Sequence, residues 1–412
     1  MNKKPSIALS LILLTFPLFY SEIHAQNAAA GFPRLTPDKK ALEYFHLGGN
    51  DAYSWTSLAE ISLWASGDTS ASNLEKIFSI ADEIKNSSDL PENYAEKAEF
   101  ILNYMHKNIL KTYSLHQTRI DTLIANGRYN CVSSAVLYMI LCKSLDILTF
   151  GVITKDHAFI NIPVGEIEID VETTTAYGFD PGNRKEFHDQ IGKVTGFTYV
   201  PARNYRDRET INPLRLISLI LNNRIAELER QRRWDDAVPL AIDRAALLFG
   251  ESLAVMENDK SFAARIFTDP RADLLDRLFN YSAVLLITNR EEDCVRWALT
   301  ASALYPSEER WQELIMAAVN NRANRFLRER KIKDASDFLE NNKSLLTREN
   351  YAQLNNIIRN NIAADYHNRF AAAWNRRNFE EAERILNEGL KEFSDNQQLL
   401  SDKNIIDRFK AQ

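Results

Sequence analysis

A cysteine stands where a polar loop turns into a wholly apolar stretch, in the segment Tyr129-Asn130-Cys131-Val132-Ser133-Ser134-Ala135. The N–H groups of a helix's first turn have no intrahelical acceptor and carry partial positive charge, so they stabilise a thiolate. Downstream, His157 lies in a strand-like segment, and Asp170 and Glu172 lie in the next one. This order of cysteine, histidine and carboxylate is typical of enzymes that transfer acyl groups through a thiol.

The choice of carboxylate depends on how two strands pair. Alternating apolar positions on both sides of Val164 and Gly165 predict a hairpin with His157 and the acidic residues on one face. A turn centred between Val164 and Gly165 puts Glu172 opposite His157 and leaves Asp170 one diagonal step away. A bulge would bring Asp170 opposite instead, and the pattern alone does not choose.

The chemistry assigns a role to each of these groups. The Cys131 thiol is the expected nucleophile, and His157 acts first as general base and then as general acid. A carboxylate holds the imidazole in the required tautomer. The Cys131 N–H is one expected donor to the oxyanion, and Asn130 and Gln117 carry the amides nearest in sequence for a second donor.

Other kinds of site are less compatible with the residues. Cys131 could be an inert core thiol, but its polar neighbours argue against that. Cys142 follows eleven positions later, about 16 Å along a helix, and is expected in the core, as is Cys294. No paired histidine or cysteine motif and no glycine-rich phosphate loop occurs, so we expect no metal and no cofactor. The net charge of −6 argues against a nucleic-acid partner.

The first 25 residues predict a signal peptide. Lys3 and Lys4 precede an apolar stretch at 7–20, and Ala25 provides a small residue for cleavage. We therefore expect an exported, periplasmic or secreted protein, with an uncleaved N-terminal anchor as the alternative. No later stretch reaches the ~20 apolar residues that span a bilayer.

Two domains are expected after the signal peptide, at 26–210 and 211–412. Strand patterns disappear from about Asn212, and amphipathic helices continue to the C-terminus. A short element recurs there, with Arg or Asn before acidic residues and a small residue, each following one helix and opening another. Its four copies are Arg232–Ala237, Asn289–Cys294, Arg330–Ala335 and Arg377–Ala382. This predicts a degenerate array of helical repeats, with an unrelated helical bundle as the alternative.

At these motifs, residues 95–181 resemble the transglutaminase-like superfamily, a papain-like group. The resemblance implies an α+β papain-like domain with an antiparallel sheet. It also implies Cys131 as nucleophile, His157 as base and Asp170 as orienting acid. Tyr129 replaces a glycine common in that family, and Val171-Glu172 replaces its usual continuation after the aspartate. The C-terminal helices resemble divergent tetratricopeptide repeats, which commonly bind peptides or proteins.

The sequence thus predicts thiol-dependent acyl transfer on a peptide or protein amide, either hydrolysis or cross-linking to an amine. A non-catalytic module that recruits a protein partner through its repeats is the alternative. A structural factor of the cell envelope whose thiol senses redox state is a third hypothesis.

Overall fold

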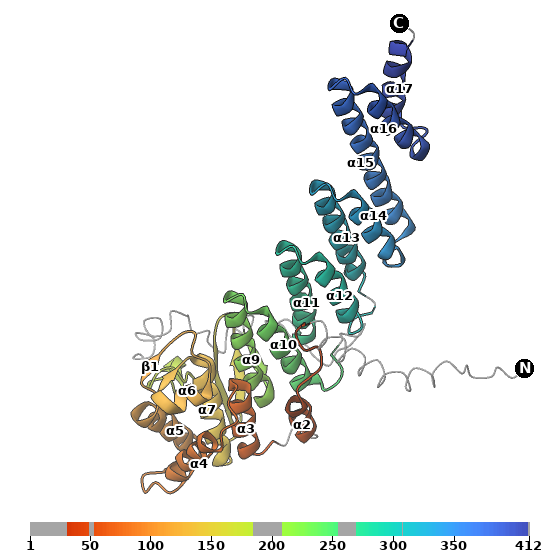
Figure 1. Ribbon diagram of the computed structural model, residues 1–412. Helices are drawn as coiled ribbons and strands as arrows, with labels where there is room; N and C mark the ends of the chain where they lie inside the picture. The colour runs from red at the N-terminus through yellow and green to blue at the C-terminus, as the bar shows by residue number, and fades with distance from the viewer. Residues whose placement is uncertain (1–30, 49–52, 184–207, 254–268, 307, 411–412) are drawn as a thin grey trace, which may run out of the picture. The chain divides into compact units, whose positions relative to one another are not determined.

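The computed structural model describes residues 31–48, 53–183, 208–253, 269–306 and 308–410 (Figure 1). The chain forms two compact units that divide between Phe279 and Asn280. The boundary predicted from the sequence lies at 210/211. The predicted signal peptide, residues 1–25, lies outside the described residues.

The first unit packs helices against a small antiparallel sheet. Its helices are α2 (Lys39–Leu47), α3 (Trp55–Ser66), α4 (Ala71–Lys85), α5 (Tyr94–Asn108), α6 (Ile120–Asn126), α7 (Cys131–Ser144), α9 (Pro213–Arg230), α10 (Trp234–Phe249) and α11 (Pro270–Ile287), the last crossing the division. The sheet has the order β5-β4-β3-β6, from β3 (Phe150–Ile153), β4 (Ala158–Val164), β5 (Ile167–Val171) and β6 (Glu209–Ile211). A parallel pair of two-residue strands joins β1 (Thr112–Tyr113) to β2 (Arg128–Tyr129).

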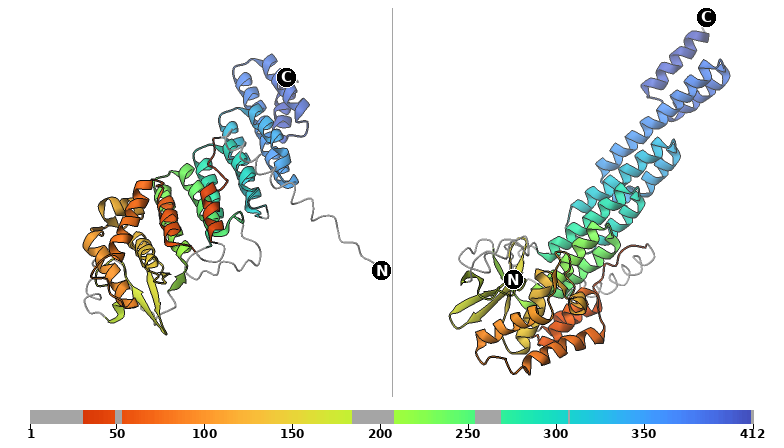
Figure 2. Two further views of the ribbon diagram at one scale, coloured as in Figure 1. Left: turned by 90° about the horizontal axis from the view of Figure 1, so that it is seen from below. Right: turned by 90° about the vertical axis from the view of Figure 1, so that its left-hand side faces the viewer.

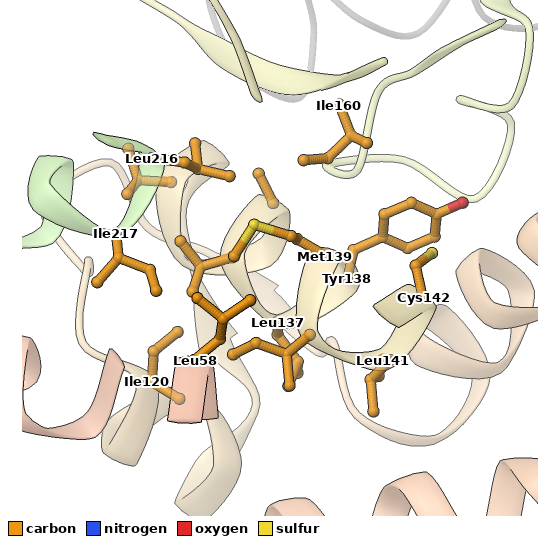
Figure 3. Close-up of a cluster of buried hydrophobic side chains, with 14 of the residues drawn as sticks. Leu58, Ile120, Leu137, Tyr138, Met139, Leu141, Cys142, Ile160, Leu216 and Ile217 are labelled. Atoms are coloured by element: carbon orange, nitrogen blue, oxygen red, sulfur yellow. The ribbon is translucent and has the colours of Figure 1, made fainter. Parts of the chain in front are cut away.

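Helix α7 is the centre of this unit. Every residue from Cys131 to Cys142 is buried, because a helix that is apolar on all sides must be enclosed. It packs against α3, α5, α9 and strand β4. Figure 3 shows Leu137 and Met139 of α7 among Leu58, Leu216 and other apolar side chains from neighbouring elements. The rigid packing around α7 fixes the position of the cysteine at its first turn.

The hairpin β4–β5 forms, but its register differs from the one considered above. Val164 pairs with Ile167, so the two turn residues are Gly165 and Glu166. Gly165 has φ +63°, a conformation that glycine adopts without strain. The ladder ends at the pair of Ile160 with Val171, which places Glu172 just beyond the strand.

The predicted papain-like α+β domain is wrong. The described residues are mostly helical, and their strands are confined to two small sheets. The two-residue alternation that favours strands covers only the segment from about 148 to 171, and the other strands have two or three residues. Contacts of α9 with α3 and α10 supply much of the core, so helices rather than a sheet organise the unit.

The second unit consists of helices that follow one another as hairpins (Figure 2). After the C-terminal part of α11, its helices are α12 (Glu291–Ala301), α13 (Arg310–Arg328), α14 (Ile332–Asn341), α15 (Arg348–Asn375), α16 (Phe379–Glu392) and α17 (Gln397–Lys410), with a short 3₁₀ turn at Lys343–Leu345. In each of the four recurring segments the first residues form a turn after one helix and the remaining residues begin the next helix, which confirms that part of the prediction. Each has a residue in the left-handed region, at φ 59–60°: Arg232, Asn289, Arg330 and Arg377.

Within the described part of the chain, no helix is both long enough and apolar enough to cross a membrane.

Candidate active site

Cys131 occupies the first position of α7 and is held there by a capping box. The Asn130 side-chain oxygen accepts the Ser133 N–H at 3.0 Å, and the Ser133 hydroxyl accepts the Asn130 N–H at 2.9 Å. The N–H groups of Cys131 and Val132 find no acceptor among the described residues. They therefore remain available to an anion formed beside the sulfur, as the sequence analysis expects for Cys131.

His157 lies at the tight turn that leads into β4, where its carbonyl accepts the Thr154 N–H at 2.8 Å. Its Nε2 lies 2.5 Å from Oε2 of Glu172, so Nδ1 is the ring nitrogen left to serve Cys131. Burial by itself lowers the pKa of His157. The charges of Glu172 and Cys131, and hydrogen bonds to both side chains, outweigh burial and raise this pKa well above its usual value. The imidazole is therefore stabilised in its protonated form, between the carboxylate of Glu172 and the sulfur of Cys131.

Glu172 is fully buried and is fixed by the loop that follows β5. In addition to His157, its carboxylate accepts the Thr174 hydroxyl at 2.5 Å and the Thr174 N–H at 3.1 Å, both on Oε1. The Glu172 N–H donates to the Gly178 carbonyl at 2.8 Å. A Cβ on Gly178 would lie 1.9 Å from the Glu172 carbonyl oxygen, so this loop requires glycine there.

The structure places Asp170 in a different interaction. Arg208 donates to both of its carboxylate oxygens, at 2.6 and 2.7 Å, and Asn161 donates to Oδ1 at 3.2 Å. Both members of this ion pair are buried. The Arg208 guanidinium also lies over the ring of Phe159, 4.8 Å from its centroid, and that ring stacks beside His157. The structure therefore brings Cys131, His157 and Glu172 together, whereas Asp170 is paired with Arg208.

Neither amide proposed as a second oxyanion donor is aimed at Cys131. Gln117 donates to the carbonyls of Arg119 and Arg128 at 2.8 and 2.7 Å, and it accepts the Arg119 N–H. Asn130 caps α7 and donates to the Leu115 carbonyl at 3.2 Å. Both side chains hold the loop that carries the cysteine.

Tyr113 of β1 is a site residue that the sequence analysis did not identify. Its hydroxyl is buried and makes no hydrogen bond of normal geometry within the described residues. Burial raises the pKa of Tyr113, and the charge of the nearby Cys131 raises it further. Only the pairing of β1 with β2, directly before Cys131, brings this tyrosine to the site, and no local motif signals it.

A pocket of about 440 Å³ opens at the cysteine and the histidine. The turn Thr154–Ala158 and the residues next to Cys131 form part of its lining. Helix α9 forms another wall, with residues that recur at helical spacing: Leu219, Asn222, Asn223, Ala226, Glu227 and Arg230. The wall combines primary amides with charged groups, which suits a polar, hydrogen-bonding ligand.

Among the described residues, no group of three or more His, Cys, Asp or Glu side chains is arranged to hold a metal ion. Cys142 and Cys294 are buried, and burial raises the pKa of each thiol. Cys131 is thus the cysteine with a partner for acid–base chemistry.

Comparison with known proteins finds no matching family model and no matching curated protein. A solved structure with some likeness is the crystal structure of menin, whose title states that it reveals the binding site for the Mixed Lineage Leukemia protein. The alignment has 10% identity and a TM-score of 0.35, and it covers 90% of this chain and 93% of menin. A score this low assigns neither fold nor function.

Proposed function

We propose that this protein is a thiol-dependent acyl-transfer enzyme in which Cys131 is the nucleophile, His157 the general acid and base, and Glu172 the orienting carboxylate. The observation that carries the proposal is the buried series of these three side chains at the wall of a pocket. A buried carboxylate, imidazole and thiol are costly to assemble and are typical of a functional site. The residue motifs shared with transglutaminase-like proteins support the same chemistry.

The reaction divides into acylation and deacylation. In acylation, Nδ1 of His157 holds the proton given up by the thiol, and the sulfur forms a bond to the carbonyl carbon of the substrate amide. The resulting oxyanion faces the N–H groups of Cys131 and Val132 and the hydroxyl of Tyr113. His157 then gives its proton to the leaving nitrogen as the C–N bond breaks, which leaves a thioester on Cys131.

In deacylation, water or a primary amine attacks the thioester carbon. His157 takes the proton of the attacking group and returns a proton to the departing sulfur, which restores the thiol. Throughout both steps Glu172 accepts from Nε2, so that Nδ1 always faces the reaction. Water gives hydrolysis and an amine gives a new amide, and both outcomes share the same acyl-enzyme.

The proposed substrate is an amide of a peptide or protein. Asn222 and Asn223 on α9 line the pocket with side chains that both donate and accept hydrogen bonds, as a peptide backbone requires. Recruitment of a protein partner by the helical repeats stays a separate prediction.

The test measures three products from one unfolded model protein, dimethylated casein, incubated with the full chain. New amino termini report peptide hydrolysis, ammonia reports attack on glutamine amides, and incorporation of a labelled primary amine reports transfer. We expect at least one product with the wild-type chain and none with Cys131→Ser. Cys142→Ser is the matched control, because its thiol is buried away from His157.

Product formation that persists in Cys131→Ser, or absence of all three products while Cys131 is shown to be reduced, contradicts the proposal. The second result would favour the binding-module alternative.

A further inference from the structure

A second pocket of about 440 Å³ adjoins the one at Cys131. The two pockets share His116, Asn223 and Glu227 in their linings, so a ligand can extend from one into the other. Nothing in the proposed reaction uses the second pocket. Its lining includes three arginines, Arg119, Arg224 and Arg233, in addition to the carboxylates Glu227 and Asp236.

Two of these arginines already have a carboxylate partner. Arg119 donates to both oxygens of Asp121, at 3.0 and 2.7 Å, and Arg233 pairs with Asp236 at 2.7 Å. Arg224 differs, because no carboxylate lies within ion-pair distance of it among the described residues. Its guanidinium donates to the Ala65 carbonyl at 2.5 Å, at the end of α3. An arginine has five N–H donors, and the Ala65 carbonyl uses one of them, so Arg224 keeps donors for a ligand in the pocket.

The surroundings of Arg224 are partly buried and carry charges of both signs. Burial lowers the pKa of Arg224 and the neighbouring Arg119 charge lowers it further, whereas the charges of Asp121 and Asp243 raise it. Gly67 permits this placement, because a Cβ there would lie 2.7 Å from Nη2 of Arg224. A partly buried cation beside a second cation, facing an open pocket, is the arrangement that binds carboxylates.

We propose that the second pocket is a specificity subsite in which Arg224 binds a carboxylate of the peptide substrate while the reacting amide lies at Cys131. This inference rests on the proposed function. The carboxylate belongs either to an acidic side chain near the reacting residue or to the C-terminus of a short peptide. Both sources present the same planar anion to the guanidinium fork.

Calorimetric titration of the full chain carrying Cys131→Ser tests the subsite without any reaction. Three synthetic peptides share one glutamine-containing core. The first is capped and neutral, the second carries a glutamate two residues after the glutamine, and the third ends in a free carboxylate. We expect at least one acidic peptide to bind about tenfold or more tightly than the neutral one, with a preference that weakens as salt rises. The tighter of the two acidic peptides identifies the source of the carboxylate.

Three substitutions in the same background locate the effect. Arg224→Gln keeps a donor for Ala65 but loses the charge, so the preference for the acidic peptide should disappear. Arg224→Lys keeps the charge and should retain part of the preference. Arg128→Gln is the matched control, an exposed arginine outside both pockets, and should leave the preference unchanged.

Equal binding of the three peptides, no binding of any, or a preference that survives in Arg224→Gln overturns the inference. Because binding requires no thiol, such a failure is distinct from failure of the proposed reaction, which the casein experiment reports separately.

Discussion

Two carboxylates at the end of strand β5, Asp170 and Glu172, should respond in different ways to loss of charge. Glu172→Gln should impair the reactivity of Cys131, whereas Asp170→Asn should impair stability. The reason is that Glu172 accepts from the imidazole of His157, while Asp170 is bound by Arg208. The two substitutions change the side chains equally, since each replaces one oxygen by an amide nitrogen.

The size of the first effect follows from the contacts of Glu172. Its two oxygens accept from Nε2 of His157 and twice from Thr174, and an amide has only one oxygen for all three donors. At least one donor must then face the new NH₂ group. A hydrogen bond to a charged group contributes ~1.5–3 kcal/mol. At ~1.36 kcal/mol per tenfold change, the equilibrium of the His157 imidazole shifts about 10-fold to 150-fold away from its protonated form.

The size of the second effect follows from burial. Asp170→Asn leaves the Arg208 guanidinium, whose side chain is 4% exposed, without its counter-charge. Removing one partner of a buried ion pair typically costs ~3–5 kcal/mol. The free energy of unfolding should fall by about that amount.

The assay pairs iodoacetamide alkylation of Cys131, read by peptide mass spectrometry near about pH 6.5, with urea unfolding of the same samples. We expect Glu172→Gln to slow alkylation of Cys131 about 10-fold to 150-fold. Asp170→Asn should change the alkylation rate less than about threefold, since the Asp170 carboxylate is bound by Arg208 and Asn161. The reasoning is refuted if Asp170→Asn slows alkylation as much as Glu172→Gln does, or if Glu172→Gln leaves the rate unchanged.

Three further predictions concern the same site. Tyr113→Phe should slow acylation of Cys131 by a chromogenic ester about 10²- to 10³-fold. It should leave iodoacetamide alkylation nearly unchanged, because alkylation forms no oxyanion. Equal effects on both rates would show that Tyr113 does not belong to the oxyanion site. The raised pKa of His157 contributes stability that is fully present below the unfolded pKa of ~6.5 and is lost as pH rises through the folded pKa. The free energy of unfolding in urea should therefore decrease at alkaline pH in the wild-type chain and not in His157→Gln. Identical pH profiles for the two chains would contradict this. Gly178→Ala should lower the free energy of unfolding by ~1–3 kcal/mol and slow alkylation of Cys131, because the added Cβ forces the loop after Glu172 to move. An unchanged alkylation rate would show that this loop does not position the Glu172 carboxylate.

Sequence reasoning located the cysteine helix because its signals are local. Asn130 and Ser133 form the cap within one turn, and the apolar residues after them require burial on all sides. The hairpin was also visible from its alternation, but its register was not, because the turn is built on Gly165 and Glu166 instead of Val164 and Gly165.

The partner of His157 depends on contacts that are distant in the sequence. Asp170 and Glu172 lie on one face by their spacing, but Asp170 pairs with Asn161 in the ladder and is bound by Arg208, 38 residues later. Tyr113 reaches Cys131 only through the parallel pairing of two short strands. The papain-like fold class was wrong for a related reason, since a strand pattern in one hairpin does not reveal how many helices make up the rest of the unit.

The most direct measurement is intact-protein mass spectrometry of the full chain after brief exposure to p-nitrophenyl acetate. The account predicts one acetyl group on Cys131, formed rapidly in the wild-type chain, slowly in His157→Gln and not at all in Cys131→Ser, and removed faster when a primary amine is added. Acetylation of Cys131 at the same rate with and without His157, or no thioester on Cys131 in the wild-type chain, would contradict it.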